Sequence, residues 1–325
     1  MTEATTDDLL ARRPFGSTGL SVPPIAIGCA PLGNMPETFA YGVTEEDATA
    51  TVRAALGSPI DYIDTAASYG DGESERRVGL VIRELGGLPA GAVLQTKQGR
   101  DPQTGDYSGE TIKRRLARSL DLLGLDRVQI VYLHDAEWTT FVDAVAPGGP
   151  VDVLRSYRDE GVIQYLGVAS GPVEVETQYV ETGIFDALIT HNRYTLLNQT
   201  ANALIDAAAD RGMAVLNAAP YGSGMLAKGP DAYPRYAYQD ASPVLVDRTR
   251  QIMEVCERYG VPLPAVALQF STRDPRITST IVGMSRPERI QQSIDNHTYP
   301  IPDELWAEVR ALPPLDEDPE KDRWK

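Results

Sequence analysis

The sequence predicts an α/β protein, a (β/α)8 TIM barrel with an N-terminal β-hairpin and a C-terminal extra helix. The first observation is a series of short apolar runs, spaced widely enough for a helix to separate each run from the next. The second is that three runs end on a residue suited to chemistry, namely Asp64, Lys97 and His134. Because the carboxyl ends of the strands form the active face of such a barrel, we expect these side chains to meet there.

The predicted strands are mostly apolar, as expected of parallel strands covered by helices. They are Ile25–Gly28, Tyr62–Asp64, Val93–Lys97, Val128–His134, Tyr165–Val168, Ala187–Thr190, Ala214–Asn217 and Thr278–Val282. The intervening segments carry one apolar stripe at helical spacing, for example Ile112, Leu116, Leu120 and Leu123. Strands and helices therefore alternate along the whole chain.

Two segments lie outside this alternation. Phe15–Val22 combines glycines with short apolar stretches, and we expect a small hairpin that closes the bottom of the barrel. Ile301–Ala311 has Pro302 at an expected first turn, and we expect an extra helix on the outside. We treat residues 1–325 as a single barrel domain with a core of about 15–311.

Composition excludes several classes of function. The chain has 325 residues and a net charge of −16, which argues against nucleic-acid or anionic-membrane partners because a basic surface is missing. No secretion signal and no apolar run of membrane-spanning length is present, so we expect a cytoplasmic protein. Neither the two cysteines nor the three histidines have the spacing of metal ligands, and we expect no metal.

Asp64, Tyr69, Lys97 and His134 together predict a site for hydride transfer. Moving a hydride to or from a carbon that bears oxygen requires a proton to move on that oxygen. The pKa of a tyrosine hydroxyl is normally about 10, and a nearby ammonium favours its anion. We therefore expect Tyr69 to exchange the proton, Lys97 to tune it, Asp64 to orient Lys97, and His134 to hold the substrate oxygen.

The order and spacing of these residues resemble the aldo-keto reductase superfamily. The resemblance rests on Asp64, Tyr69 and Gly70 in an Asp-x4-Tyr-Gly pattern, followed by Lys97 and His134, and extends from about Phe15 to Trp306. Three sequence segments are most similar to the bacterial D-threo-aldose 1-dehydrogenase (L-fucose dehydrogenase) subgroup, namely Gly28–Gly33, His191–Leu197 and Ile294–Asn296. That subgroup has pyridoxal and L-galactose dehydrogenase relatives.

The resemblance implies an NAD(P)-dependent oxidoreductase acting on a sugar or another small carbonyl or alcohol compound. It places Ser170 and Asn192 at the nicotinamide carboxamide, and the backbone of Tyr221, Gly222 and Ser223 at the pyrophosphate. The adenosine end would then meet the segment that contains Gly283, Ser285, Arg286 and Arg289.

The chain departs from the family pattern around the cofactor. Ser170 and Asn192 stand where an asparagine and a glutamine are usual, and Ala218 stands where many relatives have an aromatic ring. Gly283 replaces a lysine that often binds the 2′-phosphate, which favours NAD slightly over NADP. The nearby arginines pair well with phosphate oxygens, so NADP stays open as well.

Three aromatic residues, Tyr41, Trp138 and Phe141, follow the first and fourth strands and are expected to line the substrate pocket. Two other functions stay open at this point. A cofactor-binding regulatory protein would have little turnover, and a Schiff-base aldolase on the same fold would use Lys97 as its nucleophile. A pyridoxal-type aldehyde or alcohol dehydrogenase of the same fold is a third alternative.

Overall fold

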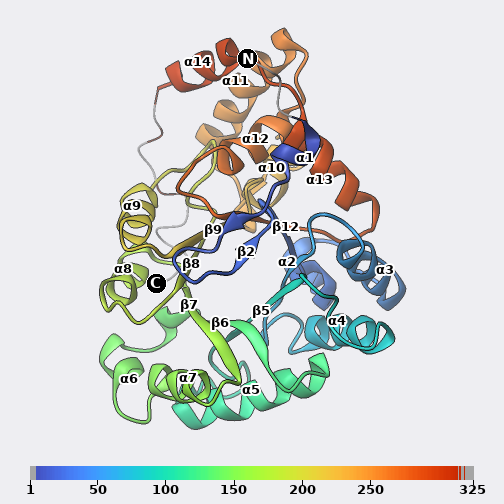
Figure 1. The fold of residues 1–325 in the computed structure, drawn as a ribbon. Coiled ribbons are helices and arrows are strands. Elements are labelled where there is room, and N and C mark those ends of the chain that lie inside the picture. The colour runs from blue at the N-terminus through green and yellow to red at the C-terminus, as the bar shows by residue number, and fades with distance from the viewer. Residues whose placement is uncertain (1–4, 314, 316–317, 319–325) are drawn as a thin grey trace.

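The computed structural model describes residues 5–313, 315 and 318. Its centre is a closed barrel of parallel strands in the order β12-β3-β4-β5-β6-β7-β8-β9 (Figure 1). These strands are β3 (Ile25–Gly28), β4 (Tyr62–Asp64), β5 (Val93–Gln98), β6 (Val128–His134), β7 (Ile163–Ala169), β8 (Ala187–His191), β9 (Ala214–Ala218) and β12 (Ser279–Gly283). The predicted barrel is confirmed.

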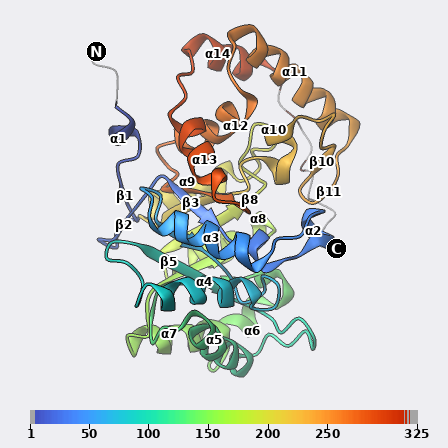
Figure 2. The same ribbon diagram turned by 90° about the vertical axis from the view of Figure 1, so that its right-hand side faces the viewer.

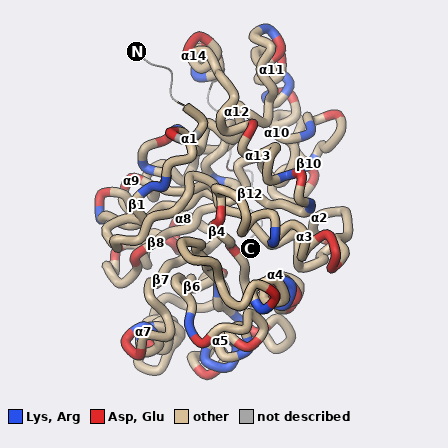
Figure 3. The backbone as a smooth tube through the Cα atoms, turned by 45° about the vertical axis from the view of Figure 1, so that its right-hand side comes forward, with Lys and Arg blue, Asp and Glu red and all other residues tan. Residues whose placement is uncertain are grey.

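Helices cover the outside of the barrel (Figure 1). They are α3 (Glu45–Leu56), α4 (Glu73–Glu84), α5 (Gly109–Leu123), α6 (Phe141–Val145), α7 (Pro150–Asp159), α8 (Val173–Glu181), α9 (Asn202–Asp210), α11 (Pro243–Tyr259), α12 (Leu263–Thr272) and α13 (Glu288–Thr298). Figure 3 shows charged residues on outer helices such as α4, α5 and α11, whereas the barrel strands are mostly uncharged. The acidic surface is therefore carried by the helical layer.

Helix α5 illustrates how local sequence fixes these helices. The Ser108 hydroxyl accepts a hydrogen bond from the Thr111 backbone N–H at 3.3 Å, which caps the first turn. Gly124 ends the helix with a φ of +71°, a conformation that suits glycine. Ile112 and Leu116 are fully buried, so the predicted apolar stripe faces the barrel.

A hairpin closes the amino-terminal end of the barrel. Its strands are β1 (Arg13–Pro14) and β2 (Ser21–Val22), so most of the predicted segment 15–22 forms the turn between them. Phe15 is fully buried, and its ring meets that of Tyr62 edge-on at 6.5 Å. The Arg13 guanidinium donates to the backbone oxygens of Thr272 and Ile277 at 2.8 and 3.0 Å. These contacts hold the hairpin against the start of the barrel.

The C-terminal extra helix is α14 (Asp303–Ala311), slightly shorter than predicted because Pro302 lies before its first turn rather than in it. Leu305 and Trp306 bury its inner face among residues of α11 and α12. Figure 1 shows α14 beside α11, away from the strands. The helix therefore extends the core without touching the carboxyl ends of β4, β5 and β6.

The segment between β9 and β12 contains more elements than a single connecting helix. It contains η3 (Gly222–Gly224), α10 (Met225–Lys228), a second hairpin of β10 (Arg235–Tyr236) and β11 (Gln239–Asp240), and both α11 and α12. Figure 2 shows this hairpin beside α2 (Pro36–Phe39), at the opposite end of the barrel from β1 and β2. The rings of Phe39 and Tyr238 lie 5.9 Å apart. The two loops therefore meet at the rim of the carboxyl-terminal face.

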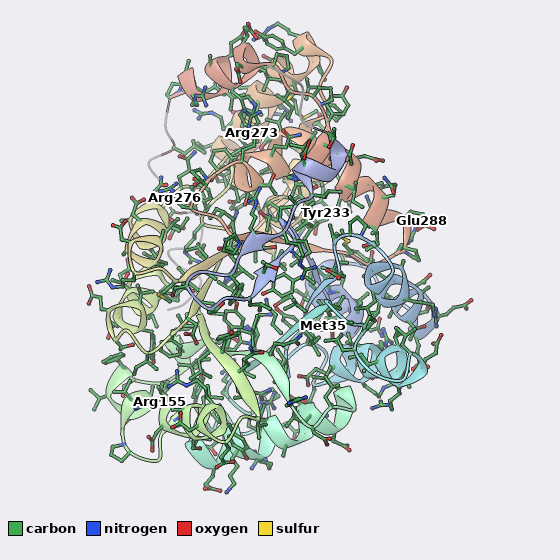
Figure 4. All side chains as sticks on the ribbon, viewed as in Figure 1. Met35, Arg155, Tyr233, Arg273, Arg276 and Glu288 are labelled. Carbon is green, nitrogen blue, oxygen red and sulfur yellow. The ribbon has the colours of Figure 1, made fainter. Side chains whose placement is uncertain are left out.

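An ion-pair cluster holds the chain just before β12 to the outer helices. Arg276, labelled in Figure 4, lies 2.6 Å from Asp274 and 2.7 Å from Asp206 on α9. The Tyr194 hydroxyl donates to the same Asp274 carboxylate.

Within the described ranges, no helix is long and apolar enough to cross a membrane.

Candidate active site

Lys97 connects Asp64 and Tyr69 at the carboxyl ends of β4 and β5. Its Nζ lies 2.6 Å from Asp64 Oδ1 and 2.9 Å from the Tyr69 hydroxyl oxygen. Its third contact is the Thr65 backbone oxygen, at 3.0 Å. Lys97 and Asp64 are each only 2% exposed, so the charges form a buried pair with no competition from solvent.

Two residues that the sequence analysis did not select support Asp64. Gln95 Nε2 donates to Asp64 Oδ1 at 2.7 Å, and the Tyr62 hydroxyl donates to Gln95 Oε1. Gln95 lies two residues before Lys97 and therefore faces the same side of β5. That alternation is the signal that could have identified it.

The backbone at position 70, directly after Tyr69, has room only for glycine. Its φ is +61°, and a Cβ there would lie 2.0 Å from the Gly33 backbone oxygen. The loop after β4 thus packs directly on η1 (Ala30–Gly33), and a larger side chain would push it away. The Met35 sulfur, which Figure 4 labels, accepts from the Gly70 N–H at 3.3 Å. Together these contacts fix the position of Tyr69.

In the free protein, burial has a larger effect on the pKa of Tyr69 than the neighbouring ammonium. Burial raises the pKa of Tyr69 well above its ordinary value, and the negative charge of Asp64 adds to the effect. The hydroxyl is therefore protonated at neutral pH. Because its oxygen accepts from Lys97, its O–H is left to point at another acceptor.

His134 ends β6 next to Tyr69. The two rings are perpendicular, with centroids 6.0 Å apart. Nδ1 lies 3.3 Å from the Ser68 hydroxyl, and Nε2 lies 3.4 Å from Asp135 Oδ1. Burial lowers the pKa of His134 below its ordinary 6.5, so the imidazole is neutral at pH 7. The Tyr107 hydroxyl donates to the His134 backbone oxygen at 2.5 Å and anchors the strand end.

Asn192 and Ser170 lie at the ends of β8 and β7, both almost fully buried. Asn192 has a φ of +57°, and its Oδ1 accepts from the Ser223 hydroxyl at 3.3 Å. Its Nδ2 is buried and has no hydrogen-bond partner among the described residues. A buried amide without an acceptor costs free energy, so this group is suited to an external acceptor.

The Gly222–Gly224 turn follows β9 in an unusual backbone conformation. Gly222, Ser223 and Gly224 have φ values of +56°, +64° and +133°. A Cβ on Gly222 would lie 2.3 Å from the Tyr236 ring, so the hairpin β10–β11 packs directly on this turn. The Tyr221 hydroxyl accepts from Asn296 on α13 at 3.4 Å. Backbone strain of this kind often gathers at ligand sites.

The segment after β12 meets the loop after β3. Gly283, Arg286 and Arg289 are exposed, and Arg289 donates to Gln292 at 2.8 Å. Burial raises the pKa of Tyr41, whereas a hydrogen bond with Ser285 and the charges of both arginines lower it. The structure therefore brings Tyr41 to the residues expected at the adenosine end of the cofactor.

The other two aromatic residues have different surroundings. Trp138 in η2 (Ala136–Trp138) is 50% exposed, and the Arg100 guanidinium lies 3.6 Å from its ring centre. Phe141 instead packs on Tyr179 of α8, with centroids 5.2 Å apart. Its ring therefore fills space between helices, which argues against its predicted place in the substrate pocket.

Tyr238 is a rim residue that sequence reasoning missed. It lies in the turn of the β10–β11 hairpin with a φ of +67°, and its hydroxyl contributes to the raised pKa of Tyr69. The hairpin therefore reaches from β9 across to the loop after β4. Two-residue strands carry no periodic apolar pattern. The only sequence feature that could have indicated this hairpin is its pair of tyrosines, Tyr236 and Tyr238.

Comparison with known proteins identifies the family of this chain. The model of the aldo/keto reductase family matches residues 24–313. The chain belongs to the aldo/keto reductase family. This family membership makes it an oxidoreductase, and the resemblance predicted from the Asp64, Tyr69, Lys97 and His134 pattern is confirmed.

Among curated relatives, the chain is 31% identical to a D-threo-aldose 1-dehydrogenase of Pseudomonas sp, over 90% of this chain and 94% of the relative. It is 30% identical to a pyridoxal 4-dehydrogenase of Microbacterium luteolum, over 92% of this chain and 96% of the relative. It is 29% identical to the L-galactose dehydrogenase of Arabidopsis thaliana, over 92% and 93%.

A solved aldo-keto reductase of Bacillus halodurans, in its holo form, superposes with a TM-score of 0.77. The superposition covers 95% of this chain and 99% of that one at 21% identity. At this identity the likeness shows the barrel fold, and the arrangement of strands agrees with it.

Proposed function

We propose that this protein transfers a hydride between a nicotinamide cofactor and a sugar or another aldehyde or alcohol carbon, with Tyr69 as proton donor and acceptor. The observation that carries the proposal is the position of Lys97 Nζ, 2.6 Å from Asp64 and 2.9 Å from Tyr69. The bound cofactor would supply or accept the hydride. The residues of this chain would place the substrate oxygen and move its proton.

In the reducing direction, the substrate carbonyl oxygen would accept the Tyr69 proton. The raised pKa of Tyr69 keeps that proton in place until charge develops on the oxygen. Lys97 would then stabilise the tyrosinate through its 2.9 Å contact. The neutral His134 would donate a second hydrogen bond and fix the direction of the oxygen. In the oxidising direction the proton returns to Tyr69.

The second side of the barrel offers groups that fit the cofactor. Asn192 Nδ2, which has no partner among the described residues, suits the carbonyl oxygen of a carboxamide, and Ser170 lies at the end of the neighbouring strand β7. The turn at Gly222 and Ser223 would place backbone groups, together with that of Tyr221, near the pyrophosphate. These assignments rest on the family resemblance and on the unpaired amide.

We propose that NAD and NADP are both accepted, with a slight preference for NAD. Gly283 offers no charge to a 2′-phosphate, which supports NAD. Arg286 and Arg289 are exposed beside Ser285, which supports residual NADP binding. Tyr41 would cover this end of the cofactor.

We propose an aldose as the preferred substrate, in keeping with the D-threo-aldose and L-galactose dehydrogenases among the relatives. Trp138 and Arg100 form an exposed stacked pair at the rim, a surface suited to the face of a sugar ring. Asp135, 3.4 Å from His134, would accept from a sugar hydroxyl. A pyridoxal-type substrate is the alternative, supported by the pyridoxal 4-dehydrogenase relative.

The geometry speaks against the Schiff-base aldolase. A nucleophilic amine needs a free lone pair. Lys97 Nζ directs its three hydrogen bonds to Asp64, Tyr69 and the Thr65 oxygen, and the carboxylate stabilises the charged form. No direction remains for attack on a carbonyl carbon.

The test is the absorbance of reduced nicotinamide with purified protein and NAD+ or NADP+. We would offer L-fucose, D-arabinose, L-galactose and pyridoxal, and carbonyl compounds with the reduced cofactors. Turnover with an aldose is the expected result. Cofactor binding without turnover on any compound would favour the regulatory protein, and turnover with pyridoxal alone would favour the alternative substrate.

A further inference from the structure

A polar cavity lies between α5 and the loops that follow β4 and β5. Its volume is about 230 Å³, and its charged lining residues are Arg114, Arg115 and Arg118 of α5, Asp71 after β4 and Asp101 after β5. Figure 3 shows blue, basic segments on α5. The lining therefore places three guanidinium groups against two carboxylates, although the whole chain has a net charge of −16.

Both aspartates have closer partners than Arg115. Asp101 Oδ1 accepts from two backbone N–H groups of the turn that follows it, at 2.9 and 3.2 Å, and Oδ2 accepts from Arg114 at 2.8 Å. Arg118 donates to Asp71 Oδ1 at 3.0 Å and to the Asp71 backbone oxygen at 2.7 Å. Arg114 and Arg118 are therefore each paired with one aspartate.

Arg115 is the arginine of this cavity without such a partner. It is 6% exposed, and its Nη1 lies 3.9 Å from Asp71 Oδ1, which is too long for a hydrogen bond. Its Nε is buried and has no hydrogen-bond partner among the described residues. Burial lowers the pKa of Arg115, yet a guanidinium stays charged in proteins. A buried cation without an acceptor costs free energy, so Arg115 is suited to an acceptor from outside the chain.

A third acid near Arg115, Glu75 of α4, does not fill this role. Its Oε1 accepts from the Thr96 hydroxyl at 2.6 Å, and its Oε2 accepts from the Ser119 hydroxyl at 2.9 Å. Burial raises the pKa of Glu75 to about 6, while these hydrogen bonds and the charge of Arg115 oppose the shift. Glu75 is not among the residues that line the cavity. Its two oxygens are thus engaged elsewhere, and Arg115 Nε stays without an acceptor.

The charge and the volume of the cavity indicate the class of ligand. A guanidinium pairs well with phosphate oxygens because it offers several N–H groups in one plane. A phosphate is tetrahedral, so its oxygens can meet guanidinium groups from different directions, whereas the two oxygens of a carboxylate lie in one plane. A water molecule takes up about 30 Å³ in the liquid, so the cavity has room for a phosphate group and part of the molecule that carries it.

We propose that this cavity binds a phosphate group, with Arg115 as its main partner and Arg114 and Arg118 beside it. The site is separate from the proposed cofactor and substrate sites, and binding there does not depend on the proposed function. The ligand is either free phosphate or a small phosphorylated compound such as a sugar phosphate.

The cavity borders the loops that carry the candidate catalytic residues. Asp71 comes two residues after Tyr69, and Asp101 comes four residues after Lys97. Burial is the main cause of the lowered pKa of His134, and the positive charge of Arg115 adds to it. A bound phosphate would offset part of that charge. The phosphate site is therefore placed to influence the proposed reaction without contact with the reacting atoms.

The test is calorimetric titration of the whole protein with sodium phosphate, at an ionic strength held constant with sodium chloride. Arg115→Gln removes the unpartnered guanidinium and should weaken phosphate binding at least about tenfold. Lys113→Gln is the matched control because it removes one positive charge from the exposed face of the same helix. Its affinity for phosphate should differ less than about twofold from that of the unaltered protein.

Thermal unfolding separates a binding role of Arg115 from a structural one. Without phosphate, Arg115→Gln should melt at the temperature of the unaltered protein or above it, because a buried charge without an acceptor is removed. Saturating phosphate should raise the melting temperature of the unaltered protein and of Lys113→Gln by about 2 °C or more, and that of Arg115→Gln by less. If Arg115→Gln does not fold, Arg115→Met, which keeps most of the alkyl chain, takes its place.

D-Arabinose 5-phosphate and D-arabinose distinguish the two sources of phosphate. Tighter binding of the sugar phosphate than of inorganic phosphate, lost in Arg115→Gln, would support a phosphorylated ligand. Equal binding of the two phosphates, also lost in Arg115→Gln, would support free phosphate.

Three results would overturn the inference. They are equal phosphate affinity in the unaltered protein and in Arg115→Gln, a phosphate effect no larger than that of chloride, and a lower melting temperature of Arg115→Gln without phosphate. These measurements need no turnover and no nicotinamide cofactor. Failure of the proposed function would therefore leave them decisive, and failure of the phosphate site would leave the proposed function untouched.

Discussion

The two sides of the barrel mouth differ in how complete they are. On the β4–β5–β6 side, Asp64, Lys97 and Tyr69 satisfy one another within 3 Å. On the β7–β8–β9 side, Asn192 keeps an unpartnered buried amide among the described residues. Backbone strain also gathers there, with positive φ at Asn192 and Ser223. The β4–β5–β6 side, which we call the closed side, is complete in the protein alone. On the β7–β8–β9 side, which we call the open side, the proposed cofactor would supply the missing partner.

This difference separates chemistry from binding. Residues that move a proton must hold their geometry before the substrate arrives, so they form a closed, mutually bonded group. Residues that hold a cofactor must leave hydrogen-bond donors and acceptors free for it. Each buried polar group that has no partner in the free protein lowers the folding stability. Substitutions on the β4–β5–β6 side should therefore mainly lower turnover, and substitutions on the β7–β8–β9 side should mainly lower cofactor affinity.

The largest effect is expected for Lys97→Met on the closed side. Removing the ammonium leaves Asp64 buried without its cation, which costs about 3–5 kcal/mol of folding free energy. Turnover should fall at least about 100-fold because the tyrosinate loses its stabilising charge. Urea unfolding and steady-state kinetics measure both effects.

The double variant Asp64→Asn with Lys97→Met separates the two consequences. It removes both charges, so most of the folding free energy lost in Lys97→Met should be regained while turnover stays low. Recovery of turnover together with stability would mean that Lys97 acts only on folding.

A smaller effect, confined to binding, is expected for Asn192→Gly on the open side. Glycine keeps the positive φ and removes only the amide, so stability should change by about 1 kcal/mol or less. Cofactor affinity should fall about tenfold, the value of one hydrogen bond to a buried group. Fluorescence titration measures the affinity, and an unchanged value would remove Asn192 from the cofactor site.

The smallest effect is expected at the adenosine end. Replacing Arg286 and Arg289 with alanine removes two exposed charges, so NADP+ should bind roughly fivefold more weakly while NAD+ binds as before. Arg155→Ala is a control that should change neither affinity, because Arg155 lies on α7 and is labelled in Figure 4 at the other end of the molecule from α13. Equal weakening of NAD+ and NADP+ would place the arginines elsewhere on the cofactor.

The same contrast explains how far sequence reasoning reached. The closed side was predictable because Asp64, Lys97 and His134 each end a strand, and parallel strands bring their ends to one face. The barrel followed from alternating apolar runs for the same reason. Gln95 and Tyr62 were overlooked, although the spacing of Gln95 from Lys97 marks it.

The open side was harder to predict from the sequence because its contacts come from long loops. Tyr41 was expected at the substrate and lies by Ser285, since β3 and β12 are neighbours only once the barrel closes. Tyr238 reaches the rim through two-residue strands that carry no periodic pattern. Phe141 was a reasonable aromatic candidate, but its ring packs on Tyr179. Such placements depend on tertiary packing rather than on local sequence.

In the proposed function, Tyr69 moves the proton while the other side of the barrel holds the cofactor. The most direct measurement is turnover and cofactor affinity of Tyr69→Phe, with Tyr259→Phe on the outer helix α11 as a matched control. We predict that Tyr69→Phe binds the cofactor as the unaltered protein does, with turnover reduced by a factor of about 100 or more. Unchanged turnover in Tyr69→Phe would show that Tyr69 is not the proton donor.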